Sequence, residues 1–164
     1  MASHRVEEDW IGERVTTLED LLRPGLRAVC VGINPSPRSV ELGHYYQGRL
    51  GRKFFARLRT AGVLSEATVG CEDDAAFASG IGFTDIVKRP TARAKELWKR
   101  DFDHGRPQLL AKRIKRPLWL SVPVISPVPS STTFSIHIFS SSGSSGHRPN
   151  IVAIGLGNGF GKNR

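Results

Sequence analysis

Residues 28–33 form a short, continuous apolar run that ends in a proline-rich turn. A run of this length with several β-branched residues predicts a strand that is buried on both faces, as in a parallel sheet. Pro35 and Pro37 fix φ and withhold their N–H groups, so the strand has to end before them. Because open α/β sheets bind their ligands at the carboxyl ends of strands, we expect Asn34 at the mouth of a binding site.

Helical and extended patterns alternate along most of the chain. In several segments apolar residues recur at helical spacing between capping residues. Helices that connect strands indicate an α/β fold with a mainly parallel sheet. We predict helices over residues 17–22, 52–61, 72–78, 94–102 and 108–115, and further strands over residues 81–87 and 117–120.

The two ends of the chain differ in composition from its middle. Residues 1–15 are polar, and we expect them to form an irregular arm. Residues 16–120 carry the α/β pattern, whereas residues 121–164 are rich in serine, proline and glycine, which is typical of irregular structure. We therefore predict one α/β domain that is incomplete at its C-terminal end and is followed by an atypical tail.

The chain is strongly basic. It has 24 lysines and arginines against 15 acidic residues, a formal net charge of +9. Such a charge favours nucleic acid or an anionic membrane as a partner, although a charge that serves only solubility remains an alternative. Neither a signal peptide nor a membrane span is visible, and the two cysteines have no metal-binding spacing. We expect a reducing intracellular compartment and no membrane partner.

Two blocks of sequence, taken together, carry a resemblance to a known family. The first is Gly-Ile-Asn-Pro-Ser at residues 32–36, followed by Gly-His-Tyr-Tyr at residues 43–46. The second covers residues 80–91 and continues to Lys-Glu-Leu at residues 95–97. Over about residues 27–120 the chain is similar to the mismatch-specific uracil/thymine DNA glycosylases of the uracil-DNA glycosylase superfamily.

This resemblance implies a three-layer, Rossmann-like α/β/α domain with a mainly parallel central sheet. It implies a monomeric, monofunctional hydrolase that removes uracil, or thymine, mispaired with guanine in double-stranded DNA, without a cofactor or a metal. The target base has to be flipped out of the duplex, which costs least at a mismatch. Such a base excision repair enzyme works in the nucleus of a eukaryote or in the cytoplasm of a bacterium.

The resemblance also assigns roles around the first block. Asn34 matches the residue that holds the attacking water, and Tyr46 matches the aromatic residue that stacks on the flipped base. The N–H of Ser36 and the main chain of Tyr46 match groups that grip uracil, and Ser39 matches a position near its 5-edge. By residue type alone, Asn34 could be only a turn former and Tyr46 only a core residue. The predicted catalytic residue is Asn34, and the predicted substrate-binding residues are Gly32, Ile33, Ser36, Ser39 and Tyr46.

Basic residues near both blocks predict a DNA-binding surface. Arg49, Arg52 and Lys53 could neutralise phosphates, although a solvated helix face would have the same pattern. Lys88 and Arg89 follow a predicted strand, and we expect them to share the DNA-binding face.

Ser130 is the candidate for the loop that penetrates the duplex in this family. It lies too close to Trp119 for the strand and helix that should precede such a loop. A truncated, inactive relative that only binds nucleic acid through its basic face is therefore the alternative function.

Overall fold

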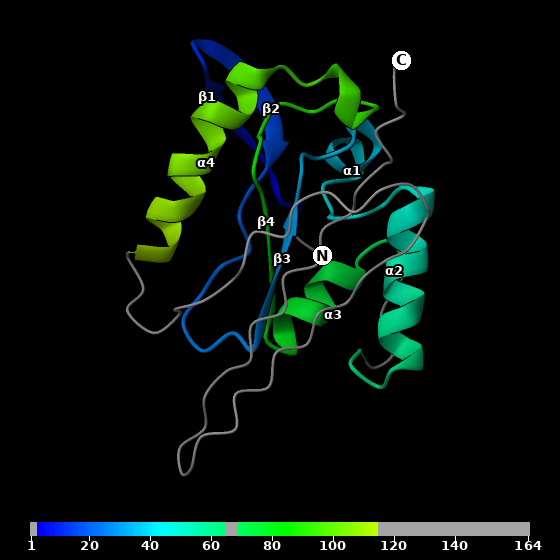
Figure 1. Ribbon diagram of the computed structural model, residues 1–164. Coiled ribbons are helices and arrows are strands. Elements are labelled where there is room, and N and C mark those ends of the chain that lie inside the picture. Colours follow the sequence, from blue (N-terminus) through cyan, green and yellow to red (C-terminus); the bar gives the residue numbers. More distant parts are fainter. Residues whose placement is uncertain (1–2, 65–68, 115–164) are drawn as a thin grey trace, which may run out of the picture.

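The computed structural model describes residues 3–64 and 69–114 of the chain (Figure 1). The predictions for residues 117–120 and for the tail at residues 121–164 lie outside the described residues. The elements are, in chain order, β1 (Arg5–Trp10), β2 (Glu13–Leu18), β3 (Ala28–Gly32), α1 (Pro37–Leu42), α2 (Arg49–Thr60), α3 (Glu72–Ala78), β4 (Ile81–Asp85), the 3-10 helix η1 (Ala94–Glu96) and α4 (Lys99–Ile114).

β3 and β4 pair in parallel at the centre of the domain. Their register runs from Ala28 opposite Ile81 to Gly32 opposite Asp85, so both strands end at the same edge. The two strands predicted from apolar runs are confirmed, although each ends slightly earlier than predicted. Every residue of β4 is buried, as expected for a strand covered on both faces. The turn after β3 and the loop after β4 therefore lie next to each other.

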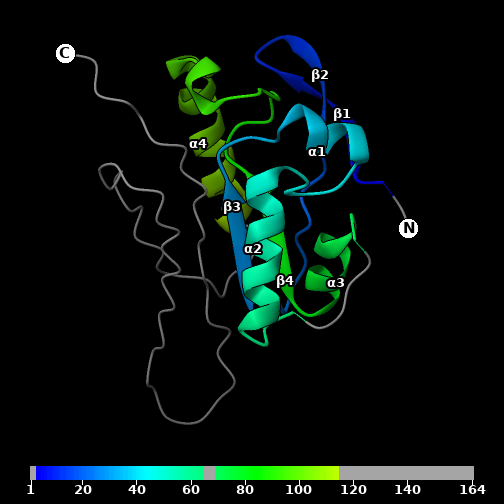
Figure 2. The same cartoon turned by 90° about the vertical axis from the view of Figure 1, so that its right-hand side faces the viewer.

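Helices cover both faces of this strand pair. α2 and α3 lie on one face and α4 lies on the other (Figure 1, Figure 2). The inner side of α2 buries Phe54, Phe55 and Leu58, and the ring of Phe55 lies 6.2 Å from that of Phe83 in β4. Burial of such side chains stabilises the fold by about 1.5–3 kcal/mol each. The predicted α/β class with a parallel centre and helices on both sides is confirmed.

Residues 5–18 form a β-hairpin. β1 and β2 pair antiparallel around a turn at Ile11 and Gly12, where φ is 52° and 79°. Positive φ at both turn residues matches the twist of hairpin strands. This corrects the expectation of an irregular arm over residues 1–15 and of a helix over residues 17–22. The inner positions of β1 are Val6, Glu8 and Trp10, and the charge of Glu8 interrupts the alternation in the sequence.

α4 is one continuous helix, although we predicted two shorter ones. It continues through Pro107, which cannot donate a backbone hydrogen bond. A Cβ on Gly105 would lie 2.0 Å from the carbonyl oxygen of Ile86, so α4 rests directly on the backbone that follows β4. In its first turn the Asp101 carboxylate accepts a hydrogen bond from the N–H of Trp98 at 2.8 Å. No helix in the described residues is long and apolar enough to cross a membrane.

Candidate active site

A cavity of about 350 Å³ lies at the edge where β3 and β4 end. Its wall comes from the turn after β3, the loop between α1 and α2, the start of α2 and the loop after β4. This volume accepts a small ring compound. Of the predicted site residues, the structure places these in the wall: Gly32, Ile33, Asn34, Ser36, Ser39, Tyr46 and Arg49.

The side chain of Asn34 is fixed by its amide nitrogen. Nδ2 donates to the carbonyl oxygen of Arg89 at 3.0 Å and to Oγ1 of Thr91 at 2.8 Å, with a longer contact to its neighbour Pro35 at 3.3 Å. Two of these three acceptors are carbonyl oxygens, which can only accept a hydrogen bond. The atom that faces them therefore has to be the amide nitrogen. Its Oδ1 has no partner within the described residues. The amide can therefore accept a hydrogen bond from a water or a ligand at the cavity.

Ser36 and Ser39 hold the first turn of α1 and the loop beyond it. The Ser36 hydroxyl caps α1 by accepting from the N–H of Ser39 at 3.1 Å. Ser39 is buried, and its own hydroxyl accepts from the N–H of Gln47 at 3.1 Å. Ser39 thus ties α1 to the loop that carries Tyr46. The backbone N–H of Ser36 makes no hydrogen bond to another described residue, so it can donate to a ligand.

Tyr46 is both a core residue and a wall of the cavity. Its φ of 58° lies in the left-handed region, which non-glycine residues seldom adopt. Its ring packs against Phe54 and Phe83, with centroid distances of 5.3 and 5.6 Å. A Cβ on Gly51 of α2 would lie only 1.7 Å from the Tyr46 carbonyl oxygen, so α2 holds this backbone closely. Burial raises the pKa of the Tyr46 hydroxyl well above its usual range, which keeps it neutral.

Asp85 is not among the predicted site residues, yet it lines the same cavity. It ends β4 directly beside Gly32, where a Cβ would lie 2.0 Å from Asp85 Oδ1. That oxygen is buried and has no hydrogen-bond partner in the part of the chain that the structure describes. Burial raises the pKa of Asp85 to about 7. A carboxyl group with this pKa can accept or release a proton near neutral pH. The strand-end argument that placed Asn34 could also have found Asp85, because the two strands end together.

The comparison with known families bears on what this cavity does. A family model of the Uracil DNA glycosylase superfamily matches residues 19–120, which is more than half of the chain. The chain belongs to the uracil-DNA glycosylase superfamily. Membership implies a hydrolase that acts on DNA and removes uracil as a DNA glycosylase in base excision repair. The matched residues include both strand-end loops that build the cavity.

A uracil-DNA glycosylase also has to hold the DNA backbone. Arg49 is exposed at the cavity, and Arg52 and Lys53 are exposed on the following turn of α2. Arg52 additionally donates to the carbonyl oxygen of Gln47 at 3.2 Å. These three cations lie on one helix, and Arg49 among them lines the cavity. The predicted contact of Ser130 lies outside the described residues.

Lys88 does not lie on the predicted DNA-binding face. Its side chain is buried, and Nζ donates to the carbonyl oxygen of Leu18 and to Oδ1 of Asp20, both at 2.7 Å. The expectation that Lys88 contacts DNA is therefore corrected. The cause is the hairpin, whose end covers the Lys88 side chain and supplies its partners.

The side chain of Arg89 also makes its contacts within the protein. Its guanidinium donates to Oδ2 of Asp101 at 2.6 Å and lies 4.5 Å from the ring centroid of Trp98. The backbone of Arg89 contributes to the site, because its carbonyl oxygen accepts a hydrogen bond from the Asn34 amide. The side chain of Arg89 thus anchors the loop after β4 to α4, and this pairing leaves little of its charge for a phosphate.

Proposed function

We propose that this chain is a monofunctional glycosylase that hydrolyses the N-glycosidic bond of uracil, or of thymine, mispaired with guanine in double-stranded DNA. The cavity supports this proposal, since it combines a rigid aromatic wall at Tyr46 with the polar groups of Asn34 and Asp85. Among the described residues no lysine lines the cavity, so none offers an amine for a covalent intermediate there. Direct attack by water is the chemistry that these side chains favour.

The single observation that carries the proposal is the fixed amide of Asn34. Held by its nitrogen, it presents Oδ1 to the attacking water and sets the direction of that water. An amide is a poor base, so we propose that the Asp85 carboxylate accepts the proton of the water. Its pKa of about 7 suits a general base near neutral pH. In the proposed step the water oxygen bonds to C1′ while the bond from C1′ to the base nitrogen breaks.

The leaving base takes the electron pair of the broken bond. Its negative charge develops on the ring oxygens, where N–H donors stabilise it. The Ser36 and Tyr46 N–H groups have no hydrogen-bond partner within the described residues, and we assign them to these oxygens. The base is then protonated from solvent, and the products are the free base and an abasic site.

The preference for mispaired bases follows from the cost of flipping. A base in a mismatch is extruded at lower cost than one in a Watson–Crick pair, so G·U is favoured over A·U without any reading of sequence. The cavity of about 350 Å³ is larger than one pyrimidine, so its volume also leaves room for the methyl group of thymine.

A single-turnover assay with excess full-length protein tests this function. The substrates are fluorescent duplexes with U opposite G, T opposite G and U opposite A, together with single-stranded U. We expect release from U·G to be the fastest, release from T·G to be slower, and release from U·A to be at least about tenfold slower than from U·G. Equal rates of uracil release from U·G and U·A duplexes would contradict the proposed mismatch preference. Salt-sensitive binding without any base release would favour the inactive nucleic-acid-binding relative.

A further inference from the structure

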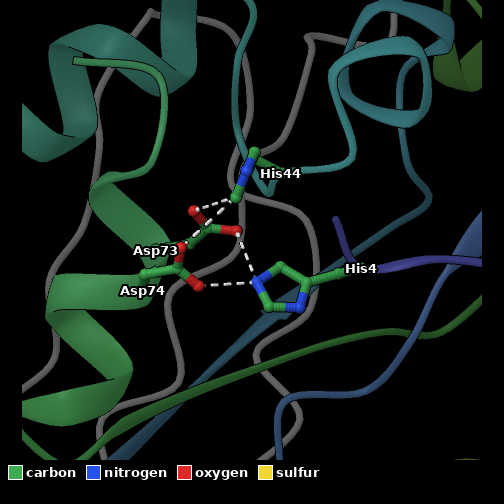
Figure 3. A group of neighbouring side chains, drawn as sticks. All are labelled: His4, His44, Asp73 and Asp74. Atoms are coloured by element: carbon green, nitrogen blue, oxygen red, sulfur yellow. Dashed lines mark hydrogen bonds and ion pairs between the residues drawn. The ribbon is translucent and has the colours of Figure 1, made fainter. Parts of the chain in front are cut away.

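Two histidines and two aspartates form a compact cluster outside the cavity (Figure 3). His4 precedes β1, His44 follows α1, and Asp73 and Asp74 begin α3. One ligand atom from each side chain lies within 4.8 Å of the others. None of the four side chains lines the cavity at Asn34. The cluster therefore joins three separate segments of the chain and is not part of the base-excision site.

Each histidine faces both aspartates, through Oδ1 of one carboxylate and Oδ2 of the other. His4 Nε2 lies 2.7 Å from an oxygen of Asp74 and 4.0 Å from one of Asp73. His44 Nδ1 lies 3.0 Å from an oxygen of Asp73 and 4.0 Å from one of Asp74. A tetrahedral ion with bonds of about 2.0–2.2 Å spaces its ligands roughly 3.4 Å apart. The observed nitrogen-to-oxygen separations lie on both sides of that spacing. Because the two imidazoles contact different oxygens of each aspartate, binding one ion requires the carboxylates to turn so that one oxygen of each faces both nitrogens.

The charge and the burial of the cluster fit a divalent cation. The two carboxylates would bring a charge of −2 to a bound ion, which one divalent ion balances. The Asp73 side chain is fully buried, and those of His4 and His44 are 14% and 8% exposed. A buried charge needs such compensation. Imidazole nitrogens together with carboxylate oxygens suit first-row transition ions and are common ligands of Zn²⁺.

Neighbouring groups orient two of these ligands. His44 Nε2 lies 3.5 Å from the sulfur of Cys71, which leaves Nδ1 to face the aspartates. Oδ2 of Asp73 accepts a hydrogen bond from the N–H of Tyr45 at 2.7 Å. Partners of this kind fix the rings and carboxylates that hold a metal.

We propose that His4, His44, Asp73 and Asp74 bind one divalent first-row transition ion, of which Zn²⁺ is the best fit. All four positions are filled by protein, so the ion is structural. It clamps the loop that carries Tyr46 to α3 and to the segment before β1. The cluster lies outside the cavity at Asn34, and the proposal does not rest on the function proposed above.

Zinc binding by the full-length, tag-free protein tests this site. Protein stripped with EDTA is titrated with ZnCl₂ against a chromogenic chelator, and its melting temperature is recorded with and without Zn²⁺. We expect one Zn²⁺ per chain and a rise in Tm of at least about 5 °C at saturation. X-ray absorption should give only nitrogen and oxygen ligands near 2.0–2.1 Å.

Two double variants decide whether this cluster is the site. His4→Gln with Asp74→Asn removes two ligands, and we expect it to bind Zn²⁺ at least about tenfold more weakly and to lose the Tm shift. His104→Gln with Asp103→Asn changes the same residue types on α4 and serves as the matched control, with unchanged binding. If the first variant does not fold, Asp74→Asn alone replaces it, since that side chain is the most exposed of the four at 28%. Failure of the wild type to bind, undiminished binding by the ligand variant, or a sulfur ligand near 2.3 Å would each overturn the proposal.

Discussion

Asp85 is the residue whose ionisation should control the reaction. Burial raises its pKa to about 7, so its basic form appears as the pH rises through that value. We predict that the excision rate climbs about tenfold per pH unit below pH 7 and levels off above it. Asp85→Asn should lower the rate by about 10² to 10⁴ and remove this dependence. Single-turnover rates from pH 5.5 to 8.5 measure both effects, and an unchanged pH profile in the variant would contradict the role of Asp85.

At the same scale, some site residues could be placed from the sequence and others could not. Asn34 follows an apolar run and stands before prolines, so its location at a strand end follows from local pattern. Asp85 ends β4 and Lys88 follows three residues later, so the strand-end argument admits both residues and does not say which of them faces the cavity. The orientation of Lys88 depends on the end of the hairpin and the residues after it, because Leu18 and Asp20 accept hydrogen bonds from the Lys88 ammonium group. Tertiary contacts of this kind leave no local signal.

At the scale of elements, the fit of α2 against the Tyr46 loop is tested by Gly51→Ala. In an isolated helix this change would add stability, by about 1 kcal/mol. Here the new Cβ would lie 1.7 Å from the Tyr46 carbonyl oxygen, so we predict a loss of about 1–3 kcal/mol in the free energy of unfolding, together with slower excision. Gly48→Ala is the control for stability, because Gly48 directly precedes the same helix and no atom of the described residues lies within 4 Å of its Cβ. Urea denaturation compares the two variants, and equal midpoints would refute this packing.

The junction between the hairpin, the loop after β4 and α4 depends on Asp101. Burial alone would raise its pKa, but hydrogen bonds from Arg89, Trp10 and the N–H of Trp98 lower it to about 2. A lowered pKa in the folded state gives stability that is present above the unfolded value near 3.8 and is lost as the pH falls through 2. We predict that Asp101→Asn costs about 3–5 kcal/mol at pH 7.

This cost should shrink as the wild type is taken below pH 4, since Asp101 is then protonated in the unfolded chain while it stays ionised in the folded protein down to about pH 2. Asp103→Asn on the same helix is the control, because its carboxylate is 49% exposed and pairs with Lys99 at the surface. We expect it to change stability by at most about 1 kcal/mol. Denaturation curves at pH 7 and pH 3 measure both variants, and an equal cost for the two would argue against an anchoring role for Asp101.

The elements that the sequence predicted well are those with a strong local signal. The central strands are continuous apolar runs, α2 has apolar residues at helical spacing, and three acidic residues mark the start of α3. β1 was missed because the charged Glu8 stands between Val6 and Trp10 on its inner side, so the sequence has no continuous apolar face there. The join across Pro107 was missed because a proline usually ends a helix, while here the packing of Gly105 on Ile86 keeps the helix continuous.

For the whole molecule, the net charge of +9 predicts DNA affinity that falls steeply with salt. Lys53 is exposed on α2 beside the cavity, so Lys53→Ala should weaken duplex binding and reduce the salt slope by about 1. Lys99→Ala is the control, since α4 lies on the opposite face of the strand pair (Figure 1) and this lysine is paired with Asp103. Fluorescence anisotropy over a range of KCl concentrations measures both slopes. Identical salt slopes in the two variants would contradict the prediction that α2 contacts DNA.

The central claim is that the amide of Asn34 places the water that releases uracil. The most direct test is the single-turnover release of uracil from a G·U duplex by the full-length wild type and by Asn34→Ala, with duplex affinity measured on the same preparations. We predict a rate at least about 100-fold lower in the variant, with affinity changed by less than about threefold. Equal rates of release in the two proteins would contradict the claim.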